Sequence, residues 1–206
     1  MRAALVALTL LVTLVAWIAL RGRPSGPPTK SHAPLVGAHY YPWYDERRWA
    51  GQPATFTPQL GRYASGDRAV AAQHVRWAKD ADLDFFLVSC LGPGGTEMRH
   101  LKSSLLPALE DAKFPFALHY ETPVALGLKP DLPIDLSARL PDGTIAGNRM
   151  AEHFDQLAAA YFTHPQYLRF EGKVVVMLYL VRNFENAAPY LKAVRERMAR
   201  RGIDLY

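Results

Sequence analysis

The chain has 206 residues, half of them hydrophobic and 21% charged, a composition that excludes a disordered or fibrous protein. Its net charge of +5 arises from four basic residues before residue 31, a stretch without any acid, and the remainder holds 20 basic against 19 acidic residues. Because a nucleic-acid-binding surface needs clustered positive charge on the folded part, we expect no nucleic-acid partner.

The first 22 residues are predicted to be a membrane segment. Residues 3–20 form an uncharged run, interrupted by two threonines alone, that as a helix would reach about 27 Å, close to the roughly 30 Å of a bilayer core. A cleaved signal peptide is the alternative, although Trp17 suits a cut after Ala19 poorly. Residues 23–34 hold four prolines and predict an extended stalk. The membrane is therefore an expected partner.

From residue 35 to residue 206 the predicted strands and helices alternate. A typical helix is Asp67–Ala81, where apolar residues recur on one face and Asp67 is placed as the N-cap. The predicted strands are Leu35–Tyr41, Leu83–Ser89, Phe114–Tyr120, Lys173–Leu180 and the beginning of a fifth at Ile203–Tyr206. The remaining predicted helices are Glu97–Ala112, Met150–Tyr161 and Asn186–Arg201, and the segments between Tyr41 and Ser65 and at Thr122–Gly147 are expected to be irregular.

This alternation predicts an α/β fold with parallel strands, most simply a partial (β/α)8 TIM barrel of about four βα units. A dinucleotide-binding sheet is disfavoured because no G-x-G-x-x-G motif follows the first strand. A whole barrel needs about 250 residues, so we expect the domain at 35–206 to be the N-terminal half of a barrel and the sequence to be truncated.

Polar and aromatic side chains gather where the predicted strands end, which is where a barrel places its functional site. Such a mixture suits a sugar, because flat rings pack on its C–H surfaces while histidine, asparagine and carboxylate bind its hydroxyl groups. The alternative to a sugar site is that these aromatic rings only cover the end of the barrel. The candidate glycan-binding residues are His39, Tyr41, Trp43, His119, Glu121, Tyr179 and Asn183.

Five segments in this order resemble glycoside hydrolase family 99 and its bacterial relatives: GAHYYPWYDERRW, TPQLGRYASGD, HVRWAKDADLDFFLVS, HYET and YFTHPQYLRFEGKVVVMLYLVRNF. The resemblance covers nearly all of the chain after the stalk. It implies a (β/α)8 barrel that acts on α-mannosides as a retaining, metal-independent endo-α-mannosidase. It also implies that Tyr41 and Trp43 line the sugar site, that Glu121 contacts substrate and that His119 supports it.

The chain departs from the family pattern in two places. Cys90-Leu91 follows the second strand where the family carries an aromatic residue, and the family's two catalytic glutamates are expected on later strands, beyond Tyr206. Because glycoside hydrolysis uses a carboxylate pair, a non-catalytic glycan-binding or scaffold protein of the cell envelope is the alternative function. The 206 residues alone are expected to be inactive as an enzyme.

Other chemistries are disfavoured by the motifs. No H-E-x-x-H is present, so we expect no metal and no cofactor. Cys90 lies among apolar residues and reads as a structural thiol, and Ser89 lacks the G-x-S-x-G context of a hydrolase nucleophile. An exported glycosidase suits a domain on the extracytoplasmic side of the membrane, or secreted after signal cleavage, although the basic residues after the apolar run count toward a cytoplasmic domain.

Overall fold

A computed structural model describes residues 34–51, 57–130 and 132–206. The predicted membrane segment at 1–22 and nearly all of the predicted stalk at 23–34 lie outside the described residues. None of the helices in the described part is both long and apolar enough to cross a membrane. Leu35–Tyr206 forms one compact unit, and its architecture decides where the candidate site lies.

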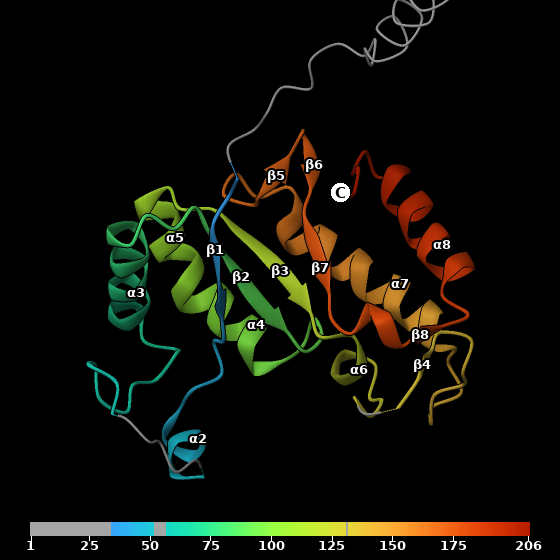
Figure 1. Ribbon diagram of the computed structural model, residues 1–206, viewed down its shortest axis with the longest axis horizontal. Helices are drawn as coiled ribbons and strands as arrows, with labels where there is room; N and C mark the ends of the chain where they lie inside the picture. The colour runs from blue at the N-terminus through green and yellow to red at the C-terminus, as the bar shows by residue number, and fades with distance from the viewer. Residues whose placement is uncertain (1–33, 52–56, 131) are drawn as a thin grey trace, which may run out of the picture. The chain divides into compact units, whose positions relative to one another are not determined.

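Four parallel strands form the central sheet in the order β1-β2-β3-β7 (Figure 1). They are β1 (Gly37–Tyr40), β2 (Phe85–Cys90), β3 (Phe116–Tyr120) and β7 (Val176–Leu178). The register places Ser89 opposite His119 and His119 opposite Met177. The strands are parallel and lie side by side in chain order, which fits a partial TIM-barrel-like fold, as the alternating pattern predicts.

Long helices connect the strands of the sheet. The helix α3 (Arg68–Asp80) begins at the predicted N-cap, where the Asp67 carboxylate accepts a hydrogen bond from the Ala69 N–H at 2.8 Å. The predicted helix at Glu97–Ala112 is present as α4 (Thr96–His100), the π-helical segment η1 (Leu101–Leu105) and α5 (Leu106–Ala112). A second π-helical segment, η2 (Ala158–Phe162), extends α7 (Ala146–Leu157), and α8 (Ala188–Ala199) packs beside α7.

Several short elements occur where the sequence predicts irregular chain or a longer strand. Two short helices, α2 (Glu46–Ala50) and α6 (Thr122–Ala125), occupy segments predicted to be irregular. The predicted strand at Lys173–Leu180 is divided: β6 (Lys173–Val174) pairs antiparallel with β5 (Arg169–Phe170), and β7 alone joins the sheet. The remaining short elements are β4 (Ile134–Asp135), which pairs with β8 (Phe184–Glu185), and the 3-10 turn η3 (Val181–Asn183).

The fifth predicted strand is represented by one residue pair. Leu205 bridges to Val174 in parallel, and two backbone hydrogen bonds accompany the pairing: Val174 N–H donates to the Asp204 carbonyl at 2.8 Å, and Tyr206 N–H donates to the Val174 carbonyl at 2.9 Å. The chain therefore returns to the strands after α8, which is the connection that a βα unit requires.

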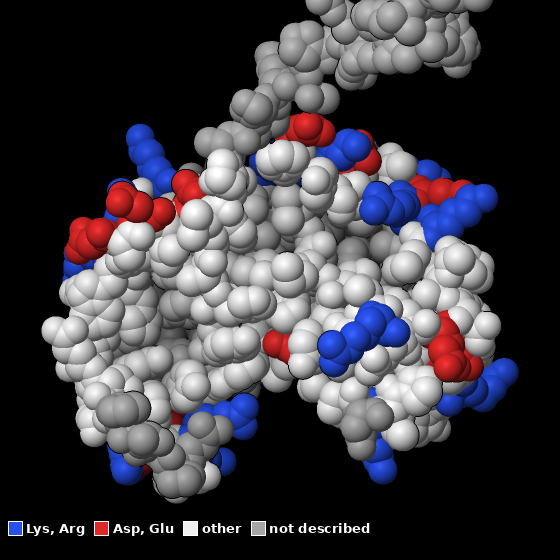
Figure 2. Space-filling model, in the orientation of Figure 1, with Lys and Arg blue, Asp and Glu red and all other residues white. Residues whose placement is uncertain are grey.

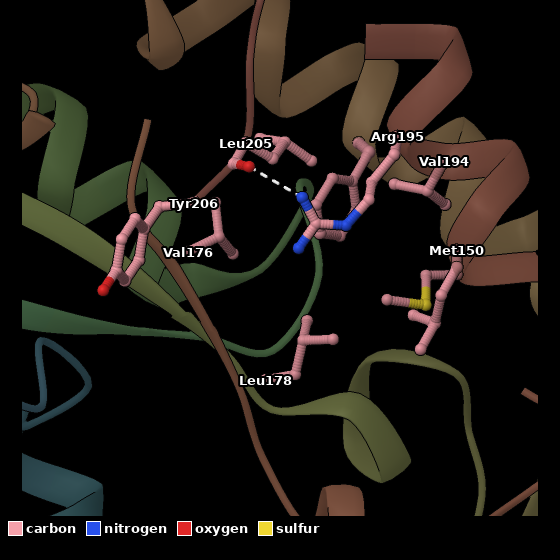
Figure 3. Close-up of a pocket in the computed structure, with 9 residues that line it drawn as sticks. Met150, Val176, Leu178, Val194, Arg195, Leu205 and Tyr206 are labelled. Atoms are coloured by element: carbon pink, nitrogen blue, oxygen red, sulfur yellow. Dashed lines mark hydrogen bonds between the residues drawn. The ribbon is translucent and has the colours of Figure 1, made fainter. Parts of the chain in front are cut away.

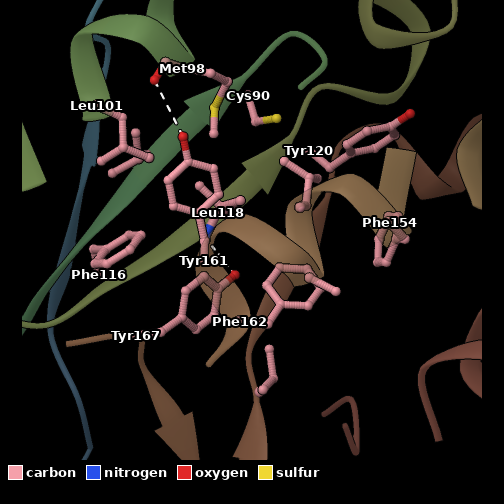
Figure 4. Packing of buried hydrophobic residues seen from close by; sticks show 14 of the residues in the cluster. Cys90, Met98, Leu101, Phe116, Leu118, Tyr120, Phe154, Tyr161, Phe162 and Tyr167 are labelled. Carbon is pink, nitrogen blue, oxygen red and sulfur yellow. Dashed lines mark hydrogen bonds between the residues drawn. The ribbon is translucent and has the colours of Figure 1, made fainter. Parts of the chain in front are cut away.

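The hydrophobic core lies between the sheet and its helices (Figure 4). All five residues of β3 are buried, since this strand lies between two others and is covered on both faces. Tyr167 anchors the core, because its hydroxyl accepts from the Leu118 N–H at 3.1 Å and donates to the Val175 carbonyl at 3.0 Å. This rigid centre fixes the carboxyl ends of the strands.

Candidate functional site

Parallel strands bring their carboxyl ends to one edge of the sheet, and five predicted site residues meet there. His39 and His119 lie within β1 and β3, and the other three follow directly after β1, β3 and β7. We call this group the strand-end cluster: His39, Tyr41, His119, Glu121 and Tyr179. The sheet register therefore assembles residues that are up to 140 positions apart in the chain.

Ring contacts connect the histidines and tyrosines of the cluster. The His119 ring lies 4.9 Å from that of His39 and 5.4 Å from that of Tyr179, measured between centroids, and both contacts are edge-on. The rings of His39 and Tyr41 are nearly parallel at 6.0 Å. Tyr41 and Tyr179 are each 39% exposed, so the cluster presents aromatic surface to solvent. Exposed rings beside buried polar groups are the arrangement that a sugar site needs.

Glu121 provides the carboxylate of the cluster. It is 9% exposed, and its Oε1 accepts a hydrogen bond from the Ser89 hydroxyl at 2.8 Å. The His119 Nδ1 lies 3.7 Å from the same oxygen, which is beyond hydrogen-bond distance. Glu121 also begins the short helix α6, whose proline at the first turn ends the extended chain after β3.

Burial and charge together shift the pKa values in the cluster. Burial lowers the pKa of His119, the Glu121 carboxylate opposes that shift and His39 adds to it, with burial the largest effect. The pKa of the Tyr41 hydroxyl is raised by burial, then by the charge of Glu121 and by Tyr179. His119 is therefore a neutral hydrogen-bonding group near pH 7.

Trp43 extends the aromatic surface on the β1 side. Its ring lies 4.7 Å from that of Tyr41, and the Arg48 guanidinium lies 5.3 Å above it. Trp43 also lines a surface hollow with charged neighbours, whose other lining residues are Asp45, Arg47, Arg48, Leu91, Thr96 and Glu97. Trp43 therefore contacts the cluster through Tyr41 and also lines this hollow.

Asn183 lies apart from these residues. It belongs to η3 and lines a different hollow together with Leu132, Pro133, Arg182, Phe184 and Glu185. The contacts of the described residues do not connect it with the strand-end cluster. Conversely, sequence reasoning omitted Ser89 from the site, and the signal that could have found it is its place at the end of the predicted strand Leu83–Ser89.

The surface over the sheet carries little charge. Figure 2 shows mostly white side chains over the middle of this face, with a blue and a small red area right of its centre, and the other charged side chains toward its margins. Exposed large hydrophobic residues occur at the ends of β1 and β7, at Leu35, Val36, Tyr41, Met177, Tyr179 and Val181. A neutral ligand suits this surface better than a polyanion.

A separate apolar pocket of about 110 Å³ lies between β7, α7 and α8 (Figure 3). Met150, Val176, Leu178 and Val194 are among its lining, and Arg195 there donates to the Leu205 carbonyl at 2.7 Å. Because its one cationic side chain is engaged with the backbone, this pocket lacks the convergent polar groups found in the strand-end cluster.

Among the described residues, neither a reactive cysteine nor a metal site competes with the strand-end cluster as a candidate functional site. Burial raises the pKa of the Cys90 thiol to about 12, so it carries almost no thiolate at neutral pH. The part of the chain that the structure describes holds no group of three or more His, Cys, Asp or Glu residues that could bind a metal. The chemistry of the site is that of one carboxylate, two imidazoles and aromatic rings.

The fold is that of an α/β protein with a partial TIM-barrel-like sheet. Among solved structures, one titled a glycoside hydrolase-like protein aligns over 89% of this chain and 54% of its own, with a TM-score of 0.61 and 19% identity. Two structures of the family 99 endo-α-mannosidase from Bacteroides thetaiotaomicron each align over 74% of this chain. The complex with bis-tris-propane has a TM-score of 0.55 and 18% identity, over 44% of its own chain. The second structure has a TM-score of 0.53 and 17% identity, over 47% of its own chain.

The resemblance to glycoside hydrolase family 99 indicated by the sequence motifs is thereby confirmed in the structural neighbours, and at these identities the likeness establishes the fold. The chain spans about half the length of the structures that it matches. No protein-family model and no curated protein sequence matches it.

Proposed function

We propose that this chain is the N-terminal half of a glycoside hydrolase-like barrel whose strand-end cluster binds an α-mannosidic glycan. The observation that carries the proposal is the convergence of His39, His119 and Glu121 with two exposed tyrosines at the carboxyl ends of three parallel strands. Aromatic rings cover the C–H faces of a sugar, and the carboxylate and imidazole groups bind its hydroxyls. This division of roles is typical of small-molecule sites that combine apolar walls with a few convergent polar groups.

The α-mannoside enters the proposal from the neighbours. Two of them are titled endo-α-mannosidase, and their fold is shared over three quarters of this chain. We infer a retaining mechanism that needs no metal, in keeping with the sequence resemblance. Tyr41 and Trp43 would form the stacking surface, and Glu121 would contact the sugar directly.

Hydrolysis requires a second carboxylate beside the glycosidic bond, because one group protonates the leaving oxygen while the other acts at the sugar. Glu121 is the single carboxylate of the strand-end cluster. We therefore expect the 206-residue chain to bind glycan without cleaving it, and hydrolysis to need a barrel that supplies the catalytic pair. Non-catalytic glycan binding is the second candidate function, and this same lone carboxylate favours it.

Calorimetric titration of the full chain with α-1,2-mannobiose and with α-mannan tests the proposal. Glu121→Gln is expected to weaken binding by about 10- to 100-fold, since hydrogen bonds to a charged group contribute about 1.5–3 kcal/mol. Tyr41→Ala should weaken it through the loss of ring surface. Glu196→Gln, an exposed glutamate paired with Lys192 on α8, is the matched control and should bind normally.

The result that would overturn the proposal is the absence of mannoside binding by a chain that unfolds cooperatively. Release of mannose during the titration, measured by chromatography, separates the two candidate functions. Sugar release by the 206 residues alone would show that the carboxylate requirement is met elsewhere in the chain.

We also propose that residues 1–22 anchor the domain in a membrane with residues 35–206 on the extracytoplasmic side, or that they are removed as a signal peptide. The apolar run at residues 3–20 supports this proposal. Cell fractionation followed by protease treatment of intact cells tests it. A domain that stays with the soluble cytoplasmic fraction would contradict both versions.

A further inference from the structure

Ser89 is a fully buried serine that the proposed binding mode does not use. It lies in β2 directly opposite His119 of β3, and its hydroxyl donates to Glu121 Oε1 at 2.8 Å. Within the described part of the chain, this is the hydrogen bond that the Glu121 carboxylate receives. The orientation of that carboxylate therefore depends on one hydroxyl group.

The neighbouring His119 stops short of the same carboxylate. Its Nδ1 lies 3.7 Å from Glu121 Oε1, and this nitrogen is buried without a hydrogen-bond partner among the described residues. A buried imidazole and a carboxylate at this distance would each gain by closing the gap, because unpaired buried polar groups are costly. The hydrogen bond from the Ser89 hydroxyl to Oε1 holds this oxygen in place.

We infer that Ser89 is a positioning residue: it holds Glu121 Oε1 away from the buried His119 Nδ1, so that the second carboxylate oxygen stays available to a hydroxyl group of a ligand. Such an acceptor suits a hydroxyl of a sugar ring. The identity of the ligand rests on the proposed function, whereas the positioning of Glu121 by Ser89 stands on the geometry alone.

The surroundings of His119 make it a sensitive reporter of this arrangement. The titratable groups that face it are His39 from β1, Tyr179 after β7 and Glu121 after β3. Burial lowers the pKa of His119 and Glu121 opposes that shift. If Glu121 were released and moved to hydrogen-bond distance, it would favour the imidazolium form and raise the His119 pKa.

The first experiment follows the titration of His119 by NMR in the full chain without any ligand, with the signal assigned by its absence in His119→Gln. Ser89→Ala is expected to raise the pKa of His119, because the freed carboxylate closes on Nδ1. In a Glu121→Gln background the same Ser89→Ala change should leave the titration unmoved, since no charge remains to approach the imidazole.

A matched control is available in Ser104, another fully buried serine, whose hydroxyl donates to the carbonyls of Ser65 and His100. Ser104→Ala removes a buried hydroxyl outside the cluster and should not change the His119 titration. If Ser89→Ala fails to fold, Ser89→Cys keeps the shape with a weaker donor, and a smaller rise of the pKa is then expected. An unchanged His119 titration in a folded Ser89 variant overturns the inference.

The second experiment measures α-1,2-mannobiose binding to the same variants. Ser89→Ala should bind about tenfold more weakly than the parent chain, and in the Glu121→Gln background it should have no further effect. Normal binding by Ser89→Ala, despite a shifted His119, overturns the role in ligand binding. If the parent chain binds no mannoside, the proposed function fails, and the His119 titration still decides whether Ser89 positions Glu121.

Discussion

Ser89 and Cys90 are neighbours in β2 whose side chains serve opposite faces of the sheet. The Ser89 hydroxyl reaches Glu121 in the strand-end cluster, whereas Cys90 packs in the core near Met98 and Tyr161 (Figure 4). Alternation along a strand causes this division, because successive side chains point to opposite sides. One strand therefore supplies both a site residue and a core residue from adjacent positions.

The Cys90 thiol is predicted to resist alkylation in the folded protein. Burial raises its pKa to about 12, so the reactive thiolate is scarce and the sulfur is inaccessible. Iodoacetamide at about pH 8 should leave the native chain unmodified over the time in which a urea-unfolded sample reacts fully. Mass spectrometry measures both, and rapid labelling of the native chain would contradict the burial of this residue.

Five of the seven predicted glycan-binding residues lie together in the structure. They could be predicted because strand ends can be recognised in the sequence, and parallel strands bring those ends to one edge of the sheet. Trp43 lies beside them against Tyr41, and Asn183 lies in another hollow. Their roles in glycan binding stay predictions. Ser89 also ends a predicted strand, yet its contact with Glu121 could not be recognised, since Glu121 lies 32 residues further along and only strand pairing brings the two together.

Among the elements, α3 shows how far local sequence determines a boundary. The predicted N-cap, Asp67, accepts from the Ala69 N–H, and the helix ends within one residue of the predicted limit. We expect Asp67→Ala to lower the free energy of unfolding by about 1 kcal/mol, because the Ala69 N–H at the helix start would lose its acceptor. Urea denaturation measures the change. Asp67→Asn, which keeps a capping oxygen, should cost much less, and equal losses in the two variants would contradict a capping role.

The contact between α7 and α8 depends on a glycine. A Cβ atom at Gly147 would lie 2.2 Å from the Tyr190 ring, so α8 can approach α7 only where no side chain intervenes. Gly147→Ala is predicted to destabilise the protein by about 1–3 kcal/mol through overpacking, although alanine favours a helix by about 1 kcal/mol.

Thermal unfolding of Gly147→Ala measures this balance. Gly94→Ala is the matched control, because a Cβ there meets no atom within 4 Å and the midpoint should barely change. A Gly147→Ala protein as stable as its parent would mean that α8 can shift without cost.

Elements that depend on distant partners were not foreseen. The segment Lys173–Leu180 is apolar nearly throughout and predicts one strand. In the structure it forms two strands, because β6 pairs with β5 whereas β7 pairs with β3. The short pair β4 and β8 joins segments 50 residues apart, and no local pattern marks either one. Hydrophobic periodicity indicates that a segment is extended and does not indicate its partner.

At the scale of the whole molecule, one buried and two half-buried histidines make stability depend on pH. Burial lowers the pKa of His74, His119 and His153 in the folded state, whereas an unfolded histidine titrates near 6.5. Below about pH 6.5 the unfolded chain therefore binds more protons than the folded chain, and the free energy of unfolding falls as pH falls. Urea unfolding at about pH 7.5 and about pH 5.5 should show lower stability at the lower pH.

The carboxylates do not reverse this trend in that range. Hydrogen bonds lower the pKa of Asp135 and Asp142 below the usual 3.8, so their contribution is lost only at more acidic pH. Replacing His74 and His153 by glutamine should reduce the dependence on pH. A free energy of unfolding that stays constant or rises as the pH falls from about 7.5 to about 5.5 would contradict lowered pKa values for these three histidines.

The sequence by itself determined the α/β class, the four parallel strands, the cap of α3 and the residues that stand at the strand ends, because periodicity, turn residues and chain order are local properties. Only the tertiary structure decided that Ser89 donates to Glu121 and that β6 pairs with β5 instead of continuing into β7. It also decided that the His119 Nδ1 has no hydrogen-bond partner among the described residues. These features arise from pairing between segments far apart in the chain. Their free energy depends on contacts that exist only once the sheet has formed, so no local pattern records them.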